Sequence, residues 1–178
     1  AHYVGDTVLA PDGNHEAGSP EEFDVSESIQ YLQSGENILA IEGHNVSLTS
    51  SDFSLIPSLE ATTDGSTRSL VEPGDDCRFH RGKSNPNTDE PIPPPDEPEE
   101  TTIEWAEPGF DDSDWESGPT GIGYGDGDDQ TVLGDMRNNY VSCYMRREFE
   151  VVDPSAVSSL MFMIDYDDSF IAYLNGHE

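Results

Sequence analysis

The chain has 178 residues, which is enough for one medium-sized domain or two small ones with a sizeable core. Its 38 acidic residues outnumber 7 basic ones and give a formal net charge of −31, so nucleic acid and anionic membrane surfaces are not expected as partners. A hydrophobic content of 33%, with 16 Gly and 13 Pro, favours turn-rich all-β structure, and no apolar run reaches the ~20 residues of a membrane span.

The first block of the chain, residues 1–60, is expected to combine turns and strands. Its pattern predicts a short helix or turn over residues 23–32 and compact strands at residues 38–42 and 52–56. Residues 61–69 are small and polar, which predicts a linker between this block and the next.

The second block, residues 70–178, carries the clearer β pattern. A strand is expected at residues 77–81, and the prolines among acidic side chains at residues 85–100 predict an extended, solvated Pro/Glu-rich loop. Apolar and polar side chains then alternate over residues 143–151, and both faces are apolar over residues 160–166. Together these patterns predict a β-sandwich.

The end of the chain has the sequence of half a β-hairpin. Ser169–Leu174 predicts a strand, and Asn175-Gly176 is the strongest short-range signal for a two-residue type I′ turn. Only two residues follow this turn, whereas a bare strand edge costs about 1–3 kcal/mol for each polar backbone group buried without a partner. The chain also begins without Met or a signal peptide, as if entering a domain already under way. We therefore expect the return strand to come from a neighbouring subunit or the next repeat of a longer chain.

Seven segments carry a family likeness. Four are FDDSDW at residues 110–115, GPTGIGYGDGDD at 118–129, YMRREFEV at 144–151 and DYDDSFIAYLNG at 165–176. Three more are NHEAG at residues 14–18, GENILAIEGHN at 35–45 and SDFSLIP at 51–57. The first four resemble the beginning and centre of a galactose-binding-like jelly-roll domain of large secreted bacterial proteins, and the last three resemble its C-terminal portion. The resemblance implies a jelly-roll β-sandwich in which residues 70–178 of one copy are completed by residues 1–60 of the next.

The acidic excess is interpreted first as an aid to solubility in saline surroundings and second as a source of cation ligands. Calcium takes about six to eight oxygens, and a glycine-rich loop can supply both carboxylates and carbonyls. The strongest candidate is the loop that holds Asp126, Asp128 and Asp129. Two further acidic clusters are Asp111, Asp112 and Asp114, and Asp165, Asp167 and Asp168. A solvated acidic turn is the alternative for each.

The two cysteines, Cys77 and Cys143, both fall in strand-like segments. A disulfide is expected if these strands are neighbours in an oxidising compartment, and two free, half-buried thiols are the alternative. Enzymatic activity is not expected, because the chain has neither an HExxH motif nor a Gly-x-Ser-x-Gly elbow. Pairs of carboxylates carry no information here, since some pair among 38 acidic residues will have a catalytic spacing by chance.

Two features would suit a secreted or sugar-binding protein. Asn45 begins an Asn-Val-Ser sequon, which is an acceptor for N-glycosylation. Trp105, Trp115 and Tyr124 are candidates for stacking on a sugar ring, although such aromatic residues more often belong to a core.

These observations lead to two hypotheses about function. The first is a structural, extracellular or cell-surface β-sandwich that forms a filament or a tandem-repeat fibre with other copies of itself, by strand or half-domain complementation. Calcium in the acidic loops would stabilise it. The alternative is a carbohydrate-binding accessory module of a secreted enzyme or adhesin, with glycans as partners.

Overall fold

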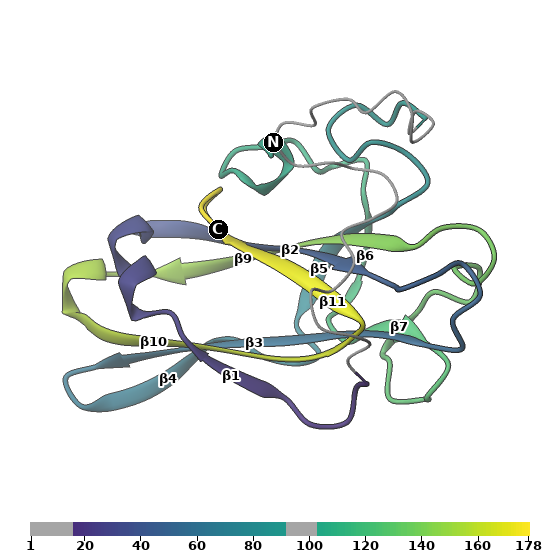
Figure 1. Cartoon of the computed structure of the whole chain (residues 1–178). Coiled ribbons are helices and arrows are strands. Elements are labelled where there is room, and N and C mark those ends of the chain that lie inside the picture. Colours follow the sequence, from purple (N-terminus) through teal and green to yellow (C-terminus); the bar gives the residue numbers. More distant parts are fainter. Residues whose placement is uncertain (1–15, 92–102) are drawn as a thin grey trace.

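The protein is a sandwich of two β-sheets (Figure 1). The structure is a computed structural model, and it describes residues 16–91 and 103–178. The expected all-β sandwich is confirmed, and its two layers are compatible with a jelly-roll-like fold. Within the described residues, no helix has both the length and the apolar character needed to cross a bilayer.

The first sheet runs in the order β1-β10-β3-β7-β8, with β4 also paired to β3. Its strands are β1 (Glu21–Asp24), β3 (Phe53–Thr63), β4 (Ser66–Val71), β7 (Ile122–Tyr124), β8 (Thr131–Val132) and β10 (Val157–Asp167). The pairs are antiparallel except for β7 and β8, which are parallel.

The second sheet runs in the order β11-β2-β9-β5-β6 and is antiparallel. Its strands are β2 (Gly35–His44), β5 (Asp76–Arg81), β6 (Glu116–Pro119), β9 (Ser142–Val151) and β11 (Ser169–Leu174). Three short 3-10 helices connect strands: η1 (Ser26–Tyr31), η2 (Glu104–Ala106) and η3 (Pro154–Ala156).

The two blocks of the sequence interleave within one chain. Strand β2 lies between β9 and β11, and β3 lies between β10 and β7. Strands from residues 21–63 therefore complete both sheets in the same copy, so the half-domain contacts expected between copies form here within one copy.

The segment expected as a linker, residues 61–69, is a hairpin. Strand β3 continues to Thr63, and β4 begins at Ser66. Asp64 and Gly65 reverse the chain with φ values of 51° and 75°, as a two-residue type I′ turn requires. Small polar side chains suit an exposed hairpin as well as a linker, so composition alone does not distinguish between them. The Pro/Glu-rich loop expected at residues 85–100 lies outside the described residues from position 92 onward.

The core forms because alternate side chains of each strand point between the sheets. The main buried cluster lies between the two sheets. It includes Leu160, Phe162 and Ile164 of β10 and Met145 and Phe149 of β9. A second buried cluster lies against the opposite face of the second sheet and includes Trp105, Trp115, Tyr144 and Tyr173. The loop that carries η2 covers this face, which is why Tyr144 is buried although it points away from the main core.

Candidate interface and cation sites

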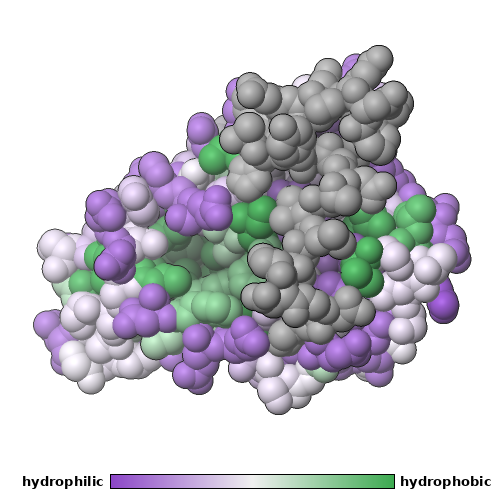
Figure 2. Space-filling view, in the orientation of Figure 1, coloured by the Kyte–Doolittle hydropathy of each residue, from purple (hydrophilic) through white to green (hydrophobic). Residues whose placement is uncertain are grey.

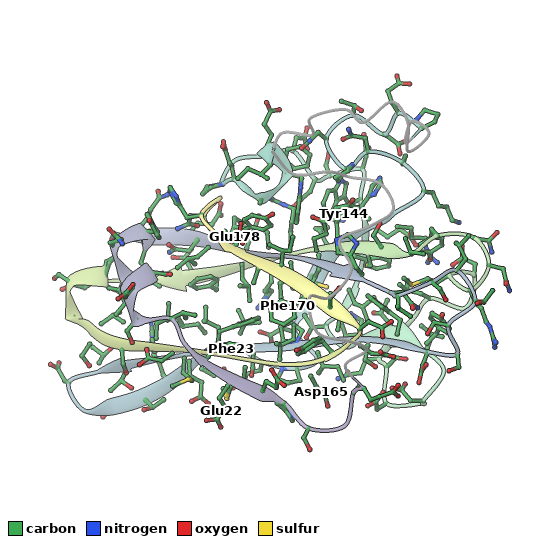
Figure 3. All side chains as sticks on the ribbon, in the orientation of Figure 1. Glu22, Phe23, Tyr144, Asp165, Phe170 and Glu178 are labelled. Carbon is green, nitrogen blue, oxygen red and sulfur yellow. The ribbon has the colours of Figure 1, made fainter. Side chains whose placement is uncertain are left out.

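The sandwich is open along one side, between the free edges of β1 and β11, and we call this side the seam. Among the described strands, β1 pairs only with β10, and β11 pairs only with β2. Phe170 of β11 meets Phe23 of β1 edge to face, with ring centroids 5.9 Å apart, and Figure 3 labels the two residues on the strands that border the seam. Phe23 remains 36% exposed, so this contact does not close the sandwich.

An apolar cleft of about 70 Å³ opens along the seam. Its lining includes Leu39, Leu160, Phe162, Ala172 and Leu174, and Figure 2 shows the corresponding green hollow between the two layers. Pockets for small-molecule ligands are usually about 300–1,000 Å³. The cleft is therefore of a size for one or two apolar side chains of a strand rather than for a sugar or a cofactor.

The hairpin turn predicted at the end of the chain is confirmed. Asn175 and Gly176 have φ values of 52° and 82°, and Leu174 exchanges two backbone hydrogen bonds of 2.8 and 3.0 Å with His177. The Asn175 side chain fixes the turn, because its Oδ1 accepts from the Ile38 amide at 2.8 Å and its Nδ2 donates to the Tyr31 carbonyl at 2.8 Å. His177 is thereby placed on the free edge of β11.

The second candidate site is the loop between β7 and β8. Asp126, Asp128 and Asp129 each offer a carboxylate oxygen, and these oxygens lie within 4.8 Å of one another. Ser54 of β3 donates a 2.9 Å hydrogen bond to Asp126 Oδ2, which anchors the loop on the sheet. The three residues predicted as calcium ligands are thus brought together.

Asp129 has the most unusual surroundings in this loop. Its Oδ1 is buried and makes no hydrogen bond, and it lies over Gly123, where a Cβ would collide with it. Burial, together with the charges of Asp126 and Asp128, raises the pKa of Asp129 to about 7. A bound cation would compensate both the buried oxygen and the mutual repulsion of the carboxylates.

The first of the two further predicted clusters, Asp111, Asp112 and Asp114, does not form a comparable site. Asp112 Oδ2 accepts a 2.7 Å hydrogen bond from Arg146 Nε, so this carboxylate already has a cation. Asp111 accepts from the Ser113 amide at 3.1 Å. In the described residues, the grouping of three acidic side chains around one point occurs only at residues 126, 128 and 129.

The cysteines are buried free thiols, so the predicted disulfide between Cys77 and Cys143 is absent. The strands β5 and β9 are neighbours, which was the condition for the bond, but their register places Cys143 opposite Arg81. Cys77 lies four residues from Arg81, or roughly 13 Å along the strand at about 3.3 Å per residue. Since a disulfide requires Cα atoms within about 7 Å, this register prevents it. Burial raises the pKa of Cys77 to about 12, which keeps it a thiol.

The predicted sugar and glycan positions are also buried. Trp105, Trp115 and Tyr124 are 2%, 9% and 8% exposed, so their rings have no free face for a sugar. Asn45 is 6% exposed, and its Nδ2, the atom that would carry a glycan, donates to the Asp52 carbonyl at 2.9 Å and to Tyr124 Oη at 3.1 Å. Glycosylation of the folded chain would break both hydrogen bonds.

Comparison with protein-family models, with curated proteins and with solved structures finds no match to this chain. The geometry of the seam and of the acidic loop therefore carries the functional argument.

Proposed function

We propose that this chain is a structural, non-enzymatic unit of an extracellular filament or tandem-repeat fibre, joined to other copies by addition of a β-strand at the seam. Under this proposal, the chain is a rearranged relative of the galactose-binding-like jelly rolls. The observation that carries the proposal is the free edge of β11 beside an apolar cleft. A strand added there would give hydrogen-bond partners to the backbone N–H and C=O groups of this edge and would cover the cleft, as in β-strand complementation.

The hydrogen-bonding parity of β11 supports this geometry. Leu174 directs its N–H and C=O to the free edge, where His177 meets them, whereas the Asn175 amide donates to Ile38 of β2. Successive residues of an antiparallel strand alternate between the two sides. Ala172 and Phe170 therefore present their backbone groups to the free edge, and an incoming antiparallel strand can continue from the pairing that His177 begins.

The charge of the chain sets a condition for this assembly. Two copies at −31 each repel one another, and this repulsion weakens as salt shortens the Debye length from about 10 Å at 0.1 M to about 3 Å at 1 M. Association at the seam should therefore be strongest in high salt or in the presence of divalent cations. This expectation accords with the interpretation of the acidic composition as suited to saline surroundings.

The test is electron microscopy and light scattering of the purified chain in high salt over a range of concentrations. We expect filaments or concentration-dependent oligomers. Ala172→Pro should abolish them at an unchanged melting temperature, because proline removes an N–H that faces the free edge rather than β2. Ala172→Ser keeps this N–H and should assemble like the natural chain. A natural chain that stays monomeric at every concentration, or an Ala172→Pro variant that still assembles, would overturn the proposal.

We also propose that calcium binds Asp126, Asp128 and Asp129 and stabilises the unit. The buried, unpaired Asp129 Oδ1 supports a bound cation in this loop. At free calcium about a hundredfold above the dissociation constant, one such site would add about 2.7 kcal/mol to the free energy of unfolding. Asp128→Asn should reduce the calcium-dependent rise in melting temperature. An equal rise in the variant and in the natural chain would contradict calcium binding at this site.

The alternative, a carbohydrate-binding accessory module, has less support. Its three candidate stacking residues are buried, and the seam cleft is too small for a sugar ring. Binding of the monomeric chain to a glycan array would favour this alternative over the filament.

A further inference from the structure

A second group of carboxylates lies at the corner where β10 passes into β11. Asp167 and Asp168 are each only 4% exposed. Buried carboxylates in proteins are normally paired with a cation or held by several hydrogen bonds, because an isolated buried charge is very unfavourable. The partners of these two residues are therefore informative.

Asp168 has one hydrogen bond from the protein, a 2.6 Å contact from the Val46 amide to its Oδ2. Among the described residues, the side chain of Asp167 interacts with Asp168, which is another carboxylate, and lies near the charges of Asp52 and Glu16. Among the described residues, no arginine, lysine or histidine forms an ion pair with either. The corner thus holds two adjacent buried acids for which residues 16–91 and 103–178 supply no counter-ion.

An amide oxygen beside this corner is also unpaired. Asn45 precedes Val46, whose amide binds Asp168, and the Asn45 side chain is held through its Nδ2 by the Asp52 carbonyl and Tyr124 Oη. The Oδ1 of Asn45 is buried and has no hydrogen bond, although the residue is only 6% exposed. This observation is independent of the carboxylates, because it concerns a neutral acceptor fixed by other contacts.

The arginine that contacts the neighbouring β2–β3 loop, Arg137, does not neutralise these carboxylates. Arg137 donates to the Thr49 carbonyl at 3.5 Å rather than to a carboxylate of the corner. Asp52, by contrast, adds a further negative charge close to Asp167. His44, which lies opposite Ser169 at this corner, directs its Nε2 toward Glu42 Oε1 at 3.0 Å rather than toward Asp167 or Asp168.

We propose that Asp167, Asp168 and the Oδ1 of Asn45 bind a hard divalent cation, calcium, at the β10–β11 corner. Calcium takes about six to eight oxygens from carboxylates, amide and backbone carbonyls and water, in flexible geometry. The three side chains supply both types of oxygen, and water completes the shell. Thiolate or imidazole ligands, which a zinc site would use, are not among the three side chains proposed.

This corner site is distinct from the loop of Asp126, Asp128 and Asp129. It links the end of β2, through Asn45, to the start of β11, so its cation would fasten the strand that borders the seam. The site does not rest on assembly, since all its ligands come from one copy. A monomeric chain that binds calcium at the corner would leave this proposal intact while the filament proposal failed.

Titration of the full chain with terbium and with calcium tests the proposal. Tyr124 binds Asn45 and lies two residues before Asp126, so its excitation should sensitise terbium at the corner and in the loop, and calcium should displace both. The luminescence of the corner site is therefore read in the Asp128→Asn background, in which the loop site is weakened. The measurements belong in about 1 M sodium chloride, where the Debye length is about 3 Å and diffuse binding to the acidic surface is suppressed. Calorimetry under the same conditions gives the number of calcium ions bound.

Asp167→Asn should weaken calcium binding at one site at least about tenfold, the loss that even an outer-shell partner typically causes, and should lower the luminescence. Asp128→Asn should leave the corner site intact, and Asp64→Asn, an exposed change of equal charge in the β3–β4 turn, should resemble the natural chain. Asn45→Ala reports on the amide oxygen and decides the question if Asp167→Asn does not fold. Full calcium binding and luminescence in folded Asp167→Asn, or in Asn45→Ala in its place, would overturn the proposal.

Discussion

Arg146 and Asp167 are both ionisable and almost fully buried, with exposures of 2% and 4%, but their surroundings are opposite. Arg146 donates to Asp112 Oδ2 at 2.7 Å, to the Glu107 carbonyl at 3.1 Å and to the Trp105 carbonyl. Asp167, among the described residues, has only carboxylates as charged neighbours: Asp168, Asp52 and Glu16. The contrast teaches that burial of a charge has two meanings. A charge with all its partners from the chain holds the fold together, and one without them indicates a ligand from outside.

The largest expected effect comes from Arg146. Arg146→Ala removes the cation that Asp112 and two loop carbonyls share, and leaves those acceptors buried, so the free energy of unfolding should fall by about 3–5 kcal/mol. Arg78→Ala is the matched control, because its guanidinium is 43% exposed and lies 4.0 Å from the same Asp112. The control should lose at most about 1 kcal/mol. Urea unfolding measures both, and equal losses would contradict the assignment of Arg146 as the structural cation.

The second prediction concerns Asp167, where removing a buried charge should raise the free energy of unfolding rather than lower it. In a chelator, Asp167→Asn removes a buried charge that has no counter-ion, so the variant should be more stable than the natural chain by about 1–3 kcal/mol. In excess calcium the order should invert, because the variant has lost a ligand of the bound cation. Thermal unfolding in chelator and in calcium tests this inversion. A variant that is less stable in both conditions would indicate that Asp167 has a structural partner after all.

The local features of the fold could be predicted from the sequence. Alternating side chains indicated β10, Asn175-Gly176 indicated the turn, and three aspartates close together in a glycine-rich loop indicated an acidic cluster. Each of these signals lies within a dozen residues, where spacing determines which side chains meet.

The long-range contacts could not be predicted. Asp112 was assigned to a metal cluster because its sequence neighbours are acidic, yet its partner, Arg146, is 34 residues away in the chain. The sequon at Asn45 predicts glycosylation, whereas the folded chain holds this side chain against Asp52 and Tyr124 and binds the following amide, that of Val46, to Asp168. The disulfide was conditional on the strands of Cys77 and Cys143 being neighbours; they are, but their register keeps the two cysteines apart. Register depends on the whole sheet rather than on the residues themselves.

The third prediction extends the comparison to apolar groups. Phe162 is 4% exposed in the core, whereas Phe23 at the seam is 36% exposed. Phe162→Ala should cost about 3–5 kcal/mol, the usual range for a buried phenylalanine, and Phe23→Ala should cost about 1 kcal/mol in the monomer, because less of its surface is removed from water. If strand addition covers the seam, Phe23→Ala should also weaken assembly in light scattering. An effect of Phe23→Ala on monomer stability as large as that of Phe162→Ala would show that the seam is already closed.

The smallest expected effect concerns His80, which packs beside the Arg146 region with ring centroids 5.4 Å from Trp115 and 6.1 Å from Tyr144. Burial lowers its pKa, although the nearby Asp89 and Glu116 oppose this shift, and its Nδ1 is buried without a hydrogen bond. The unfolded chain takes up a proton near pH 6.5, which the folded chain resists.

The stability that His80 provides is therefore complete above about pH 6.5 and is lost as the pH falls toward its lowered folded pKa. Hydrogen bonds from Arg81 and from Ser84 lower the pKa values of Glu116 and of Asp89, respectively, so these carboxylates titrate below this window. Asp129 and Asp167, whose pKa values are raised to about 7, take up protons in the folded chain over the same window and oppose this decline. The contribution of His80 is therefore the difference between two chains: in urea unfolding between about pH 7 and pH 5.5, the natural chain should lose stability relative to His80→Gln. An unchanged slope in this variant would mean that the imidazole takes up its proton in the folded chain as readily as in the unfolded one, and the region around Arg146 would then tolerate a second buried cation.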